Sequence, residues 1–362
     1  MNIESLIFWP LITSLVIGMM VTPIVIMGMR RLGFVIDPKK MQHPAHVHTK
    51  PIPKGGGIVV LIGVVMTLVM SLPIDKHLLA IFLALFLCVV VGVIDDIRGM
   101  SPLVRLGFNF LCALIVVGAG IGIPFVTNPF GGIIDLSQIR VSFNLFGEVR
   151  EIWILADLFA LLWIPFLMNA INWSSGVDGQ VSGVVAVSAV VIGLLSFTFG
   201  TDTTQWPISV LAFATTGVFA ALAVYSFFPQ KIMPGYSATT AAGLLLATMS
   251  ILSTAKIGTA MVVMGLPLLD AGITIVRRLV RGKKPWEGDR EHFHHLLLRI
   301  GWSKRKIALF YWLFSALWGI VALFGNTQIK IGAFLLMGTF IIGISIWLHY
   351  WDYSRQHAQD NG

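Results

Sequence analysis

The chain has 362 residues, of which 56% are hydrophobic and only 12% carry a formal charge. So much apolar surface cannot be buried inside one water-soluble core, which excludes a soluble globular enzyme. The net charge of +8 does not indicate a nucleic-acid partner, because basic residues in a membrane protein serve first to set its orientation.

Apolar runs follow one another along the chain, separated by charged residues, prolines or glycines. A helix of about 20 apolar residues crosses the roughly 30 Å hydrocarbon core of a bilayer. We therefore predict an all-α integral membrane protein, a single domain over residues 1–362 built as a bundle of about eleven transmembrane helices. The first run should be a retained span, because Glu4 precedes it and no small-residue cleavage signal follows. The expected spans are 5–29, 55–73, 77–94, 103–120, 153–169, 181–199, 206–226, 237–252, 257–276, 307–325 and 331–350.

Basic residues are distributed unevenly between the two sets of loops that alternate along such a bundle. Of the 25 Lys and Arg residues, one set of loops holds only Lys76, Arg140, Arg150, Lys256 and Lys330. Cytoplasmic loops carry the excess of basic residues, so the other set is predicted to be cytoplasmic, with the N-terminus outside. We expect a multi-pass protein of the cell membrane.

The longest outer loop, residues 121–152, alternates apolar and polar residues at 133–136 and 140–143, around polar turns. This period of two is typical of strands and predicts a small β-hairpin lying on the membrane. Cys88 and Cys112 fall inside apolar runs, so neither a disulfide framework nor a thiolate metal site is expected.

Ionisable residues gather on the predicted cytoplasmic face, where they need partners or a function. The first inner loop runs from Asp37 through Lys50 to three glycines at 55–57, which begin a helix. Such a start either brings backbone amides close to an anion or simply gives a flexible entry. The adjacent carboxylates Asp95 and Asp96 repel each other unless a cation or proton intervenes. They indicate metal binding or proton transfer, or else a solvated helix end.

Two further groups of polar residues lie on the same face. Asn169 and Asn172 share a helix face, and the glycines that follow allow Asp178 to turn back toward them, unless these residues merely end the helix. Asp270 lies roughly 10 Å into the membrane from Arg277, at a rise of 1.5 Å per residue. It therefore needs a partner inside the bundle.

The last inner loop carries three imidazoles within four residues, at His292, His294 and His295, among several arginines. This composition suits a polyanion such as a diphosphate, or a metal ion. Zinc is disfavoured, because the loop does not clearly offer enough further ligands.

In this order and on one face, these elements resemble the polyprenyl-phosphate N-acetylhexosamine-1-phosphate transferase family, which includes the phospho-N-acetylmuramoyl-pentapeptide transferases. The Asp-Arg pair followed by an HxHH pattern is most similar to the N-acetylglucosamine-phosphate branch. The elements that carry the resemblance are the loop 37–57, Asp95-Asp96 with Ser101-Pro102 and Arg105, the segment 169–179, Pro267-Leu268-Leu269-Asp270, and Asp289-Arg290 with the three histidines.

The resemblance implies a reaction in which polyprenyl phosphate attacks the β-phosphate of a UDP-N-acetylhexosamine. The products are a polyprenyl diphosphate-sugar, for cell-wall or surface polysaccharide synthesis, and UMP, with the assistance of magnesium or of manganese. The resemblance also implies that Asp95 or Asp96 handles the proton of the lipid phosphate. It assigns substrate contacts to Lys50, Arg105, Asp178, His292, His294 and His295, and metal contacts to Asn172, Asp95 and Asp178. It leaves a homodimer open.

Two positions depart from the family's pattern. Ser175 stands where an aspartate is usual, and Tyr236 stands where the resemblance places the main magnesium-binding aspartate. A neutral phenol is a poor magnesium ligand. The chain is therefore interpreted either as a transferase with a rearranged site, or as a non-catalytic relative that binds polyprenyl phosphate or a nucleotide sugar. A transporter or channel fits least, because transport sites lie near the bilayer midplane.

Overall fold

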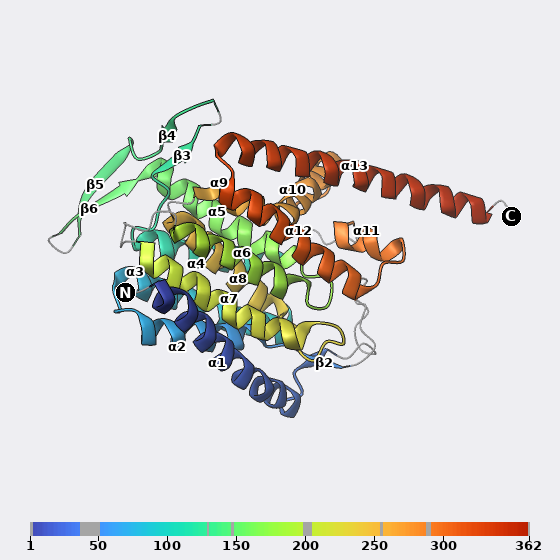
Figure 1. The fold of residues 1–362 in the computed structure, drawn as a ribbon, viewed down its shortest axis with the longest axis horizontal. Helices are drawn as coiled ribbons and strands as arrows, with labels where there is room; N and C mark the ends of the chain where they lie inside the picture. Colours follow the sequence, from blue (N-terminus) through green and yellow to red (C-terminus); the bar gives the residue numbers. More distant parts are fainter. Residues whose placement is uncertain are drawn as a thin grey trace.

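The computed structural model describes residues 3–36, 51–128, 130–145, 148–197, 205–253, 256–286 and 291–360. Most of them are helical, as predicted (Figure 1). The helices are α1 (Ile3–Arg31), α2 (Gly56–Ser71), α3 (Lys76–Arg98), α4 (Pro102–Gly118), α5 (Ile154–Trp173), α6 (Gln180–Ser196), α7 (Trp206–Ser226), α8 (Gly235–Leu252), α9 (Lys256–Val263), α10 (Gly265–Val280), α11 (Phe293–Arg299), α12 (Lys304–Phe324) and α13 (Thr327–Asp360).

Seven of the described helices are long and apolar enough to cross a membrane: α1, α3, α5, α7, α8, α12 and α13. An eighth span results if α9 and α10, which meet at 88°, are one broken span. Helices α2, α4 and α6 are apolar but shorter. The all-α membrane fold is confirmed and a helix lies in each expected range, but the count of about eleven spans is not confirmed.

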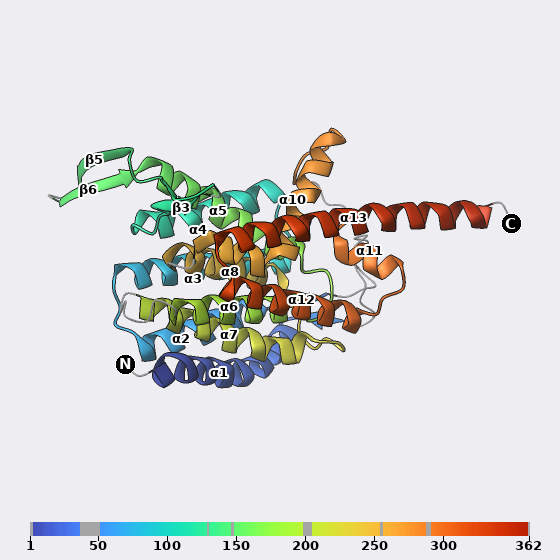
Figure 2. The same cartoon turned by 45° about the horizontal axis from the view of Figure 1, so that its top comes forward.

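The break between α9 and α10 differs from the single straight span that we expected over 257–276. Pro267 lies in the first turn of α10, where its missing N–H and fixed backbone are tolerated, whereas the same residue inside a continuous helix would remove a hydrogen bond. The chain therefore ends one helix at Val263 and starts another at Gly265. Figure 2 shows α10 leaving the bundle steeply.

The outer-loop strands are present as two antiparallel pairs. Strand β3 (Phe125–Thr127) pairs with β4 (Ile133–Asp135), and β5 (Arg140–Leu145) pairs with β6 (Glu148–Trp153) with Arg140 opposite Trp153. The predicted hairpin structure is thus confirmed. A third short pair joins β1 (Val35–Ile36) to β2 (Ile52–Pro53).

Helices α7 and α8 are the most buried spans, while α1, α12 and α13 present much of their apolar surface outward. Helix α8 packs against α3 and α5. The approach to α3 is close, because a Cβ at Gly92 would lie 2.4 Å from the Cα of Ser237. This contact brings the C-terminal end of α3 directly beside the start of α8.

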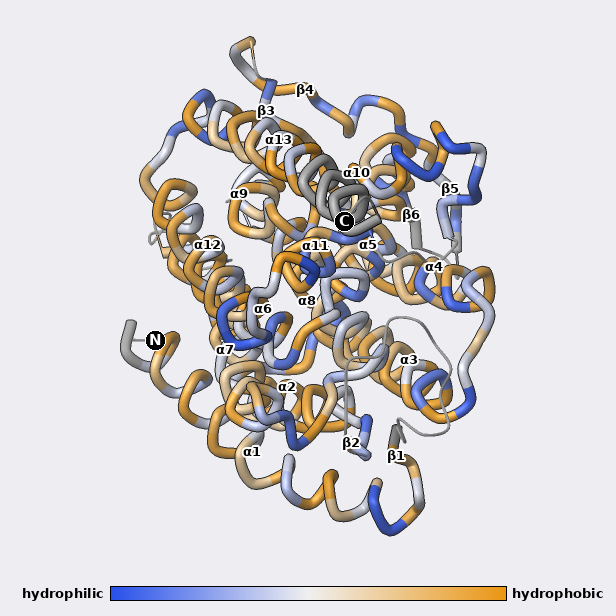
Figure 3. The backbone as a smooth tube through the Cα atoms, turned by 90° about the vertical axis from the view of Figure 1, so that its right-hand side faces the viewer, coloured by the Kyte–Doolittle hydropathy of each residue, from blue (hydrophilic) through white to orange (hydrophobic). Residues whose placement is uncertain are grey.

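The two ends of the bundle differ. The N-terminus and the hairpins of β3–β6 lie at one end, and β2 and α11 lie at the other, which we call the α11 end (Figure 1). Figure 3 looks onto the α11 end and shows hydrophilic loops and helix ends framed by largely hydrophobic helices. The sequence-predicted polar clusters that the structure describes converge at this end.

Candidate active site

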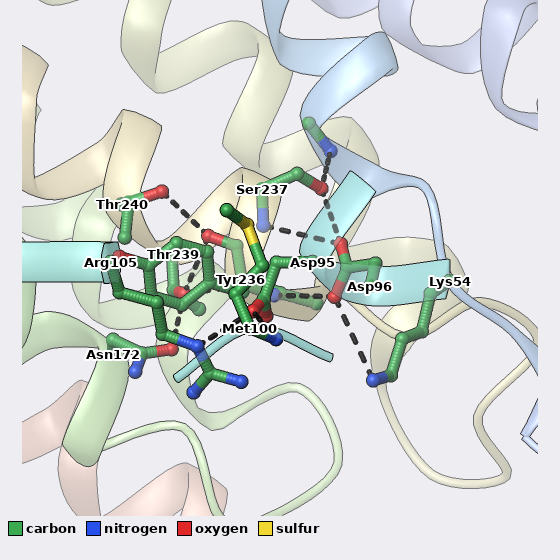
Figure 4. A network of polar contacts seen from close by, with 12 residues as sticks. Lys54, Asp95, Asp96, Met100, Arg105, Asn172, Tyr236, Ser237, Thr239 and Thr240 are labelled. Atoms are coloured by element: carbon green, nitrogen blue, oxygen red, sulfur yellow. Dashed lines mark hydrogen bonds and ion pairs between the residues drawn. The ribbon is translucent and has the colours of Figure 1, made fainter. Parts of the chain in front are cut away.

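The start of α8 is capped by a carboxylate from another helix. Asp96 accepts hydrogen bonds from the backbone N–H of Tyr236 (2.8 Å) and of Ser237 (3.2 Å), and from the Ser237 hydroxyl (2.7 Å). Helix α8 follows Pro234 and has no capping side chain of its own. The first N–H groups of a helix have no intrahelical partner, so Asp96 supplies the missing cap from α3 (Figure 4). Lys54 Nζ lies 3.7 Å from the same carboxylate.

The three glycines before α2 pack against this helix start. A Cβ at Gly56 would lie 2.8 Å from the Cα of Pro234, and one at Gly57 would lie 2.5 Å from the Cβ of Ser237. The Gly57 N–H donates to Ser237 Oγ at 3.2 Å. The glycines therefore allow α2 to approach α8. This geometry favours the packing role over the anion-binding interpretation.

Asp95 points to a different helix from its neighbour. It is buried, and its Oδ1 accepts the backbone N–H of Met100 at 2.8 Å and the Nε–H of Arg105 at 2.6 Å. Arg105 lies in the first turn of α4, which Ser101 caps. The adjacent carboxylates are therefore not a shared pair, because Asp95 fixes α4 whereas Asp96 fixes α8.

Tyr236 occupies the position that the resemblance assigns to an aspartate. Its hydroxyl donates to Asn109 Oδ1 at 3.1 Å, and the guanidinium carbon of Arg105 lies 5.0 Å from its ring centre. The stacking of a cation on an aromatic face holds the guanidinium in place (Figure 4). Asn109 Nδ2 is buried and has no hydrogen-bond partner among the described residues.

The asparagine segment lies against the same helix start. Asn172 Oδ1 accepts from Thr239 Oγ1 at 2.8 Å, and the Asn172 carbonyl accepts from Ser175 Oγ at 2.6 Å. Asn169 Nδ2 instead donates to the backbone of its own helix at Pro165 O, at 2.7 Å. Asn172 therefore belongs to the network around α8, whereas Asn169 does not.

Asp178 contacts α12. Its buried carboxylate forms an ion pair with Lys304 at 3.2 Å. Gly179 follows in the left-handed backbone region, with φ of 77°, which glycine adopts without strain. This turn leads into the start of α6.

Asp270 has the partner that its position required. Its Oδ2 lies 2.9 Å from His292 Nδ1, and its Oδ1 accepts the Phe293 N–H at 2.8 Å. Both the carboxylate and the imidazole are buried. Because a carboxylate on Nδ1 fixes the orientation and tautomer of an imidazole, Asp270 is a positioning residue for His292.

The three predicted histidines lie together, with two of their rings stacked. The His292 and His294 rings are parallel within 2° at 5.8 Å, and His295 lies 4.2 Å from His294. A Cβ at Gly176 would lie 1.8 Å from His294 Nε2, so the loop after α5 touches the histidines directly. Burial, and then the neighbouring imidazoles, lower the pKa of His294 well below its usual range. His294 is therefore neutral at pH 7.

Each of the predicted metal ligands has a protein partner of its own. Asp95 is paired with Arg105, Asp178 with Lys304, and Asn172 with Thr239. Among the described residues no group of three or more His, Cys, Asp or Glu side chains is placed to hold a metal ion. Magnesium requires oxygen ligands in nearly octahedral geometry, and this set of donors does not fit it.

Sequence reasoning missed several members of the site. Asn109, Ser237 and Lys304 each contact a predicted residue, but their sequence neighbourhoods carry no signal for it. The absence of a capping residue before Gly235 was the one available signal for a cap supplied from elsewhere. Lys50 and the Asp289-Arg290 pair lie outside the described residues.

Together, the fold and this site define a multi-pass membrane protein with a polar, hydrogen-bonded site at one end of a helical bundle. Residues 78–254 match the sequence model described as glycosyl transferase family 4. The matched range holds Asp95, Arg105, Asn172 and Tyr236. This match confirms the resemblance found in the motifs.

Named relatives extend the similarity beyond the matched range. The chain is 27% identical over 319 residues to a probable undecaprenyl-phosphate N-acetylglucosaminyl 1-phosphate transferase of Bacillus subtilis, covering 86% of this chain and 83% of that protein. It is 26% identical over 341 residues to the decaprenyl-phosphate N-acetylglucosaminephosphotransferase of Mycobacterium tuberculosis, covering 86% and 80%. A phospho-N-acetylmuramoyl-pentapeptide-transferase of Bacillus velezensis is 22% identical over 332 residues, covering 89% and 98%.

The capping role of Asp96 predicts a stability effect. In Asp96→Asn an amide replaces one carboxylate oxygen opposite the Ser237 N–H and hydroxyl, so the free energy of unfolding should fall by about 1–3 kcal/mol. Asp75→Asn is the matched control, because Asp75 caps α3 at an exposed site where asparagine caps equally well. Thermal unfolding of both variants in detergent tests this. An unchanged midpoint for Asp96→Asn would contradict the capping role.

Gly176 is predicted to tolerate no side chain. In Gly176→Ala the new Cβ overlaps the His294 ring, which also packs against His292 and His295. The overlap should lower the free energy of unfolding by about 1–3 kcal/mol. Hydrogen exchange across Phe293–Arg299 should become faster. Gly343→Ala is the control, because a Cβ there meets open space. Unchanged exchange in Gly176→Ala would show that the loop and α11 are not in contact.

The lowered pKa of His294 predicts loss of stability in acid. Below the unfolded-state pKa of about 6.5 the unfolded chain binds a proton that the buried ring does not, so stability falls by up to about 1.4 kcal/mol per pH unit. The thermal midpoint of the wild type should therefore drop between pH 7 and pH 5, and less so in His294→Gln. The exposed His77→Gln serves as the control. Equal drops in wild type and His294→Gln would refute this assignment.

Proposed function

We propose that this protein transfers a sugar-1-phosphate from a UDP-sugar to polyprenyl phosphate. The preferred group is N-acetylglucosamine-1-phosphate. The products are a polyprenyl diphosphate-sugar, for cell-wall or surface polysaccharide synthesis, and UMP. The named relatives are transferases of this kind. The observation that carries the proposal is a network of charged side chains. Asp95, Asp96 and Arg105 lie inside the range that the family model matches, and Lys54 lies before it.

In this reaction an oxygen of the lipid phosphate forms a bond to the β-phosphorus of the UDP-sugar. The bond from that phosphorus to the oxygen bridging the α-phosphate breaks, and UMP leaves with the electron pair. Because negative charge is spread over the phosphoryl oxygens in the transition state, fixed cations and hydrogen-bond donors lower the barrier. Lys54, Arg105 and His292 supply such groups, with His292 held in orientation by Asp270.

A carboxylate at this site can also handle a proton. Asp95 and Asp96 are the carboxylates of the network, and we propose that one of them accepts or steers the proton of the lipid phosphate. Asp95 is the better candidate, because Asp96 uses both oxygens to cap α8. The hydrogen bonds that Asp95 accepts from the described residues all involve Oδ1.

We propose that the α11 end faces the cytoplasm of a cell membrane, where nucleotide sugars are available. The distribution of basic residues supports this orientation, because Arg30, Arg31 and Lys54 lie at this end with Arg299 and Lys304. The N-terminus and the hairpins would then lie outside. Dependence on magnesium or manganese, and assembly as a homodimer, stay predictions from the resemblance.

The second candidate is a non-catalytic relative that binds polyprenyl phosphate or a nucleotide sugar. The observation in its favour is the Tyr236 side chain, which fills its position with a ring packed under Arg105 instead of a carboxylate. Such a protein would retain the basic residues that recognise phosphate while losing the chemistry.

The test is release of UMP by detergent-purified protein given undecaprenyl phosphate and a panel of UDP-sugars, with magnesium, manganese or EDTA. We expect release with one preferred donor, and a loss on the order of 100-fold in Asp95→Asn. Asp135→Asn, an exposed carboxylate on β4 in the outer hairpin, is the matched control and should keep full activity. Thermal stabilisation by UDP-sugar without UMP from any donor would instead establish the non-catalytic alternative.

A further inference from the structure

We propose that this protein binds the diphosphate of its nucleotide substrate with its own fixed basic side chains, led by Arg105, and needs no divalent cation at this site. The consequence for turnover rests on the proposed function. The consequence for ion binding does not, because it concerns only charges and ligands in the free protein.

The first argument is the balance of charge. Three carboxylates are buried around the start of α8 and the neighbouring loop, and each is paired with a different basic side chain. Arg105 lies 2.6 Å from Asp95, Lys54 lies 3.7 Å from Asp96, and Lys304 lies 3.2 Å from Asp178. Buried charges are stable only when paired. These described pairs therefore sum to no net charge, and they offer no surplus of negative charge to attract a divalent cation.

The second argument is the occupation of the oxygens. The two oxygens of Asp96 accept three hydrogen bonds at the start of α8, and Asp95 Oδ1 accepts two. Asn172 Oδ1 accepts from Thr239 Oγ1. To bind magnesium, these oxygens would have to exchange N–H and O–H donors for a metal that accepts little distortion. The exchange would also remove the cap of α8.

The two residues that depart from the family's pattern also change the charge of the site. Replacement of two aspartates by Ser175 and Tyr236 removes two negative charges, which is the charge that one divalent cation would balance. Tyr236 also has a positive role, since its ring supports the Arg105 guanidinium at 5.0 Å. The two substitutions are therefore consistent with each other and with loss of the ion.

The terminal nitrogens of the Arg105 guanidinium are available to a ligand. Its Nε is bound to Asp95, and its two terminal nitrogens make no hydrogen bond to any described residue. The side chain is 32% exposed. A guanidinium held at one edge and free at the other presents a rigid fork that matches two phosphate oxygens. Lys54, 21% exposed, adds a second cation next to Asp96.

The experiment measures ion binding first. Binding of Mn²⁺ to the purified full chain is followed by the electron paramagnetic resonance signal of the free ion. We expect no stoichiometric binding to the wild type, and binding of one ion to the double variant Ser175→Asp/Tyr236→Asp. Tyr236→Phe is the matched control, because it keeps the ring under Arg105 and adds no charge. One Mn²⁺ bound by the wild type and lost in Asp95→Asn would overturn the proposal.

A second measurement follows the ligand. Calorimetry should give the same dissociation constant for UDP with magnesium and with EDTA in the wild type. Arg105→Lys, which keeps the charge but loses the fork, should weaken UDP binding by about tenfold in EDTA. Wild-type binding that disappears in EDTA would refute the proposal, as would unchanged binding by a folded Arg105→Lys.

Turnover separates this inference from the proposed function. UMP release in EDTA at a rate within about twofold of that in magnesium supports both, and release abolished by EDTA overturns the inference while keeping the function. If no condition gives UMP, the proposed function fails, and the Mn²⁺ and UDP measurements still decide the inference. The wild-type arms require no variant to fold.

Discussion

The hydrogen bonds from Asp96 to the start of α8 are the contact on which the rest of the α11 end depends. One buried carboxylate from α3 satisfies two backbone N–H groups and a hydroxyl of another helix, and it also draws Lys54 from the chain entering α2. Because donors left unsatisfied in a buried site are costly, this arrangement allows little displacement of α8. The positions of Tyr236 and Thr239, one and four residues into the helix, follow from it.

Several other polar members of the site likewise join two elements. Arg105 links α4 to α3, Asn172 links α5 to α8, Lys304 links α12 to the loop before α6, and Asp270 links α10 to α11. The site is therefore also part of what holds the ends of the helices together. A loss of activity in a variant of these residues is therefore informative only beside a measurement of its stability.

The sequence predicted what depends on neighbouring residues. Apolar length located the helices, alternation located the outer hairpins, and polar clusters located the residues of the site. The sequence did not predict contacts between distant residues. The residues around Asp96 do not indicate that it caps a helix about 140 residues later, and those around Asp178 do not indicate that it pairs with Lys304. The short helix α11 was missed because its only apolar run is three leucines, too short for a span. The break at Met264 was missed because the apolar residues on both sides of it were counted as one span despite Pro267.

These contacts change how the two departures from the family's pattern are interpreted. In a list of motifs, Ser175 and Tyr236 are two losses that suggest an inactive protein. In the structure Ser175 bonds the Asn172 carbonyl, and Tyr236 bonds Asn109 and carries Arg105 on its ring. Residues freed from a function do not usually maintain buried, directional contacts with its other members, because each such contact costs the entropy of ordering it. The contacts of Tyr236 therefore favour a functional site, in which basic side chains supply the positive charge instead of a metal ion, over a site that has lost its function.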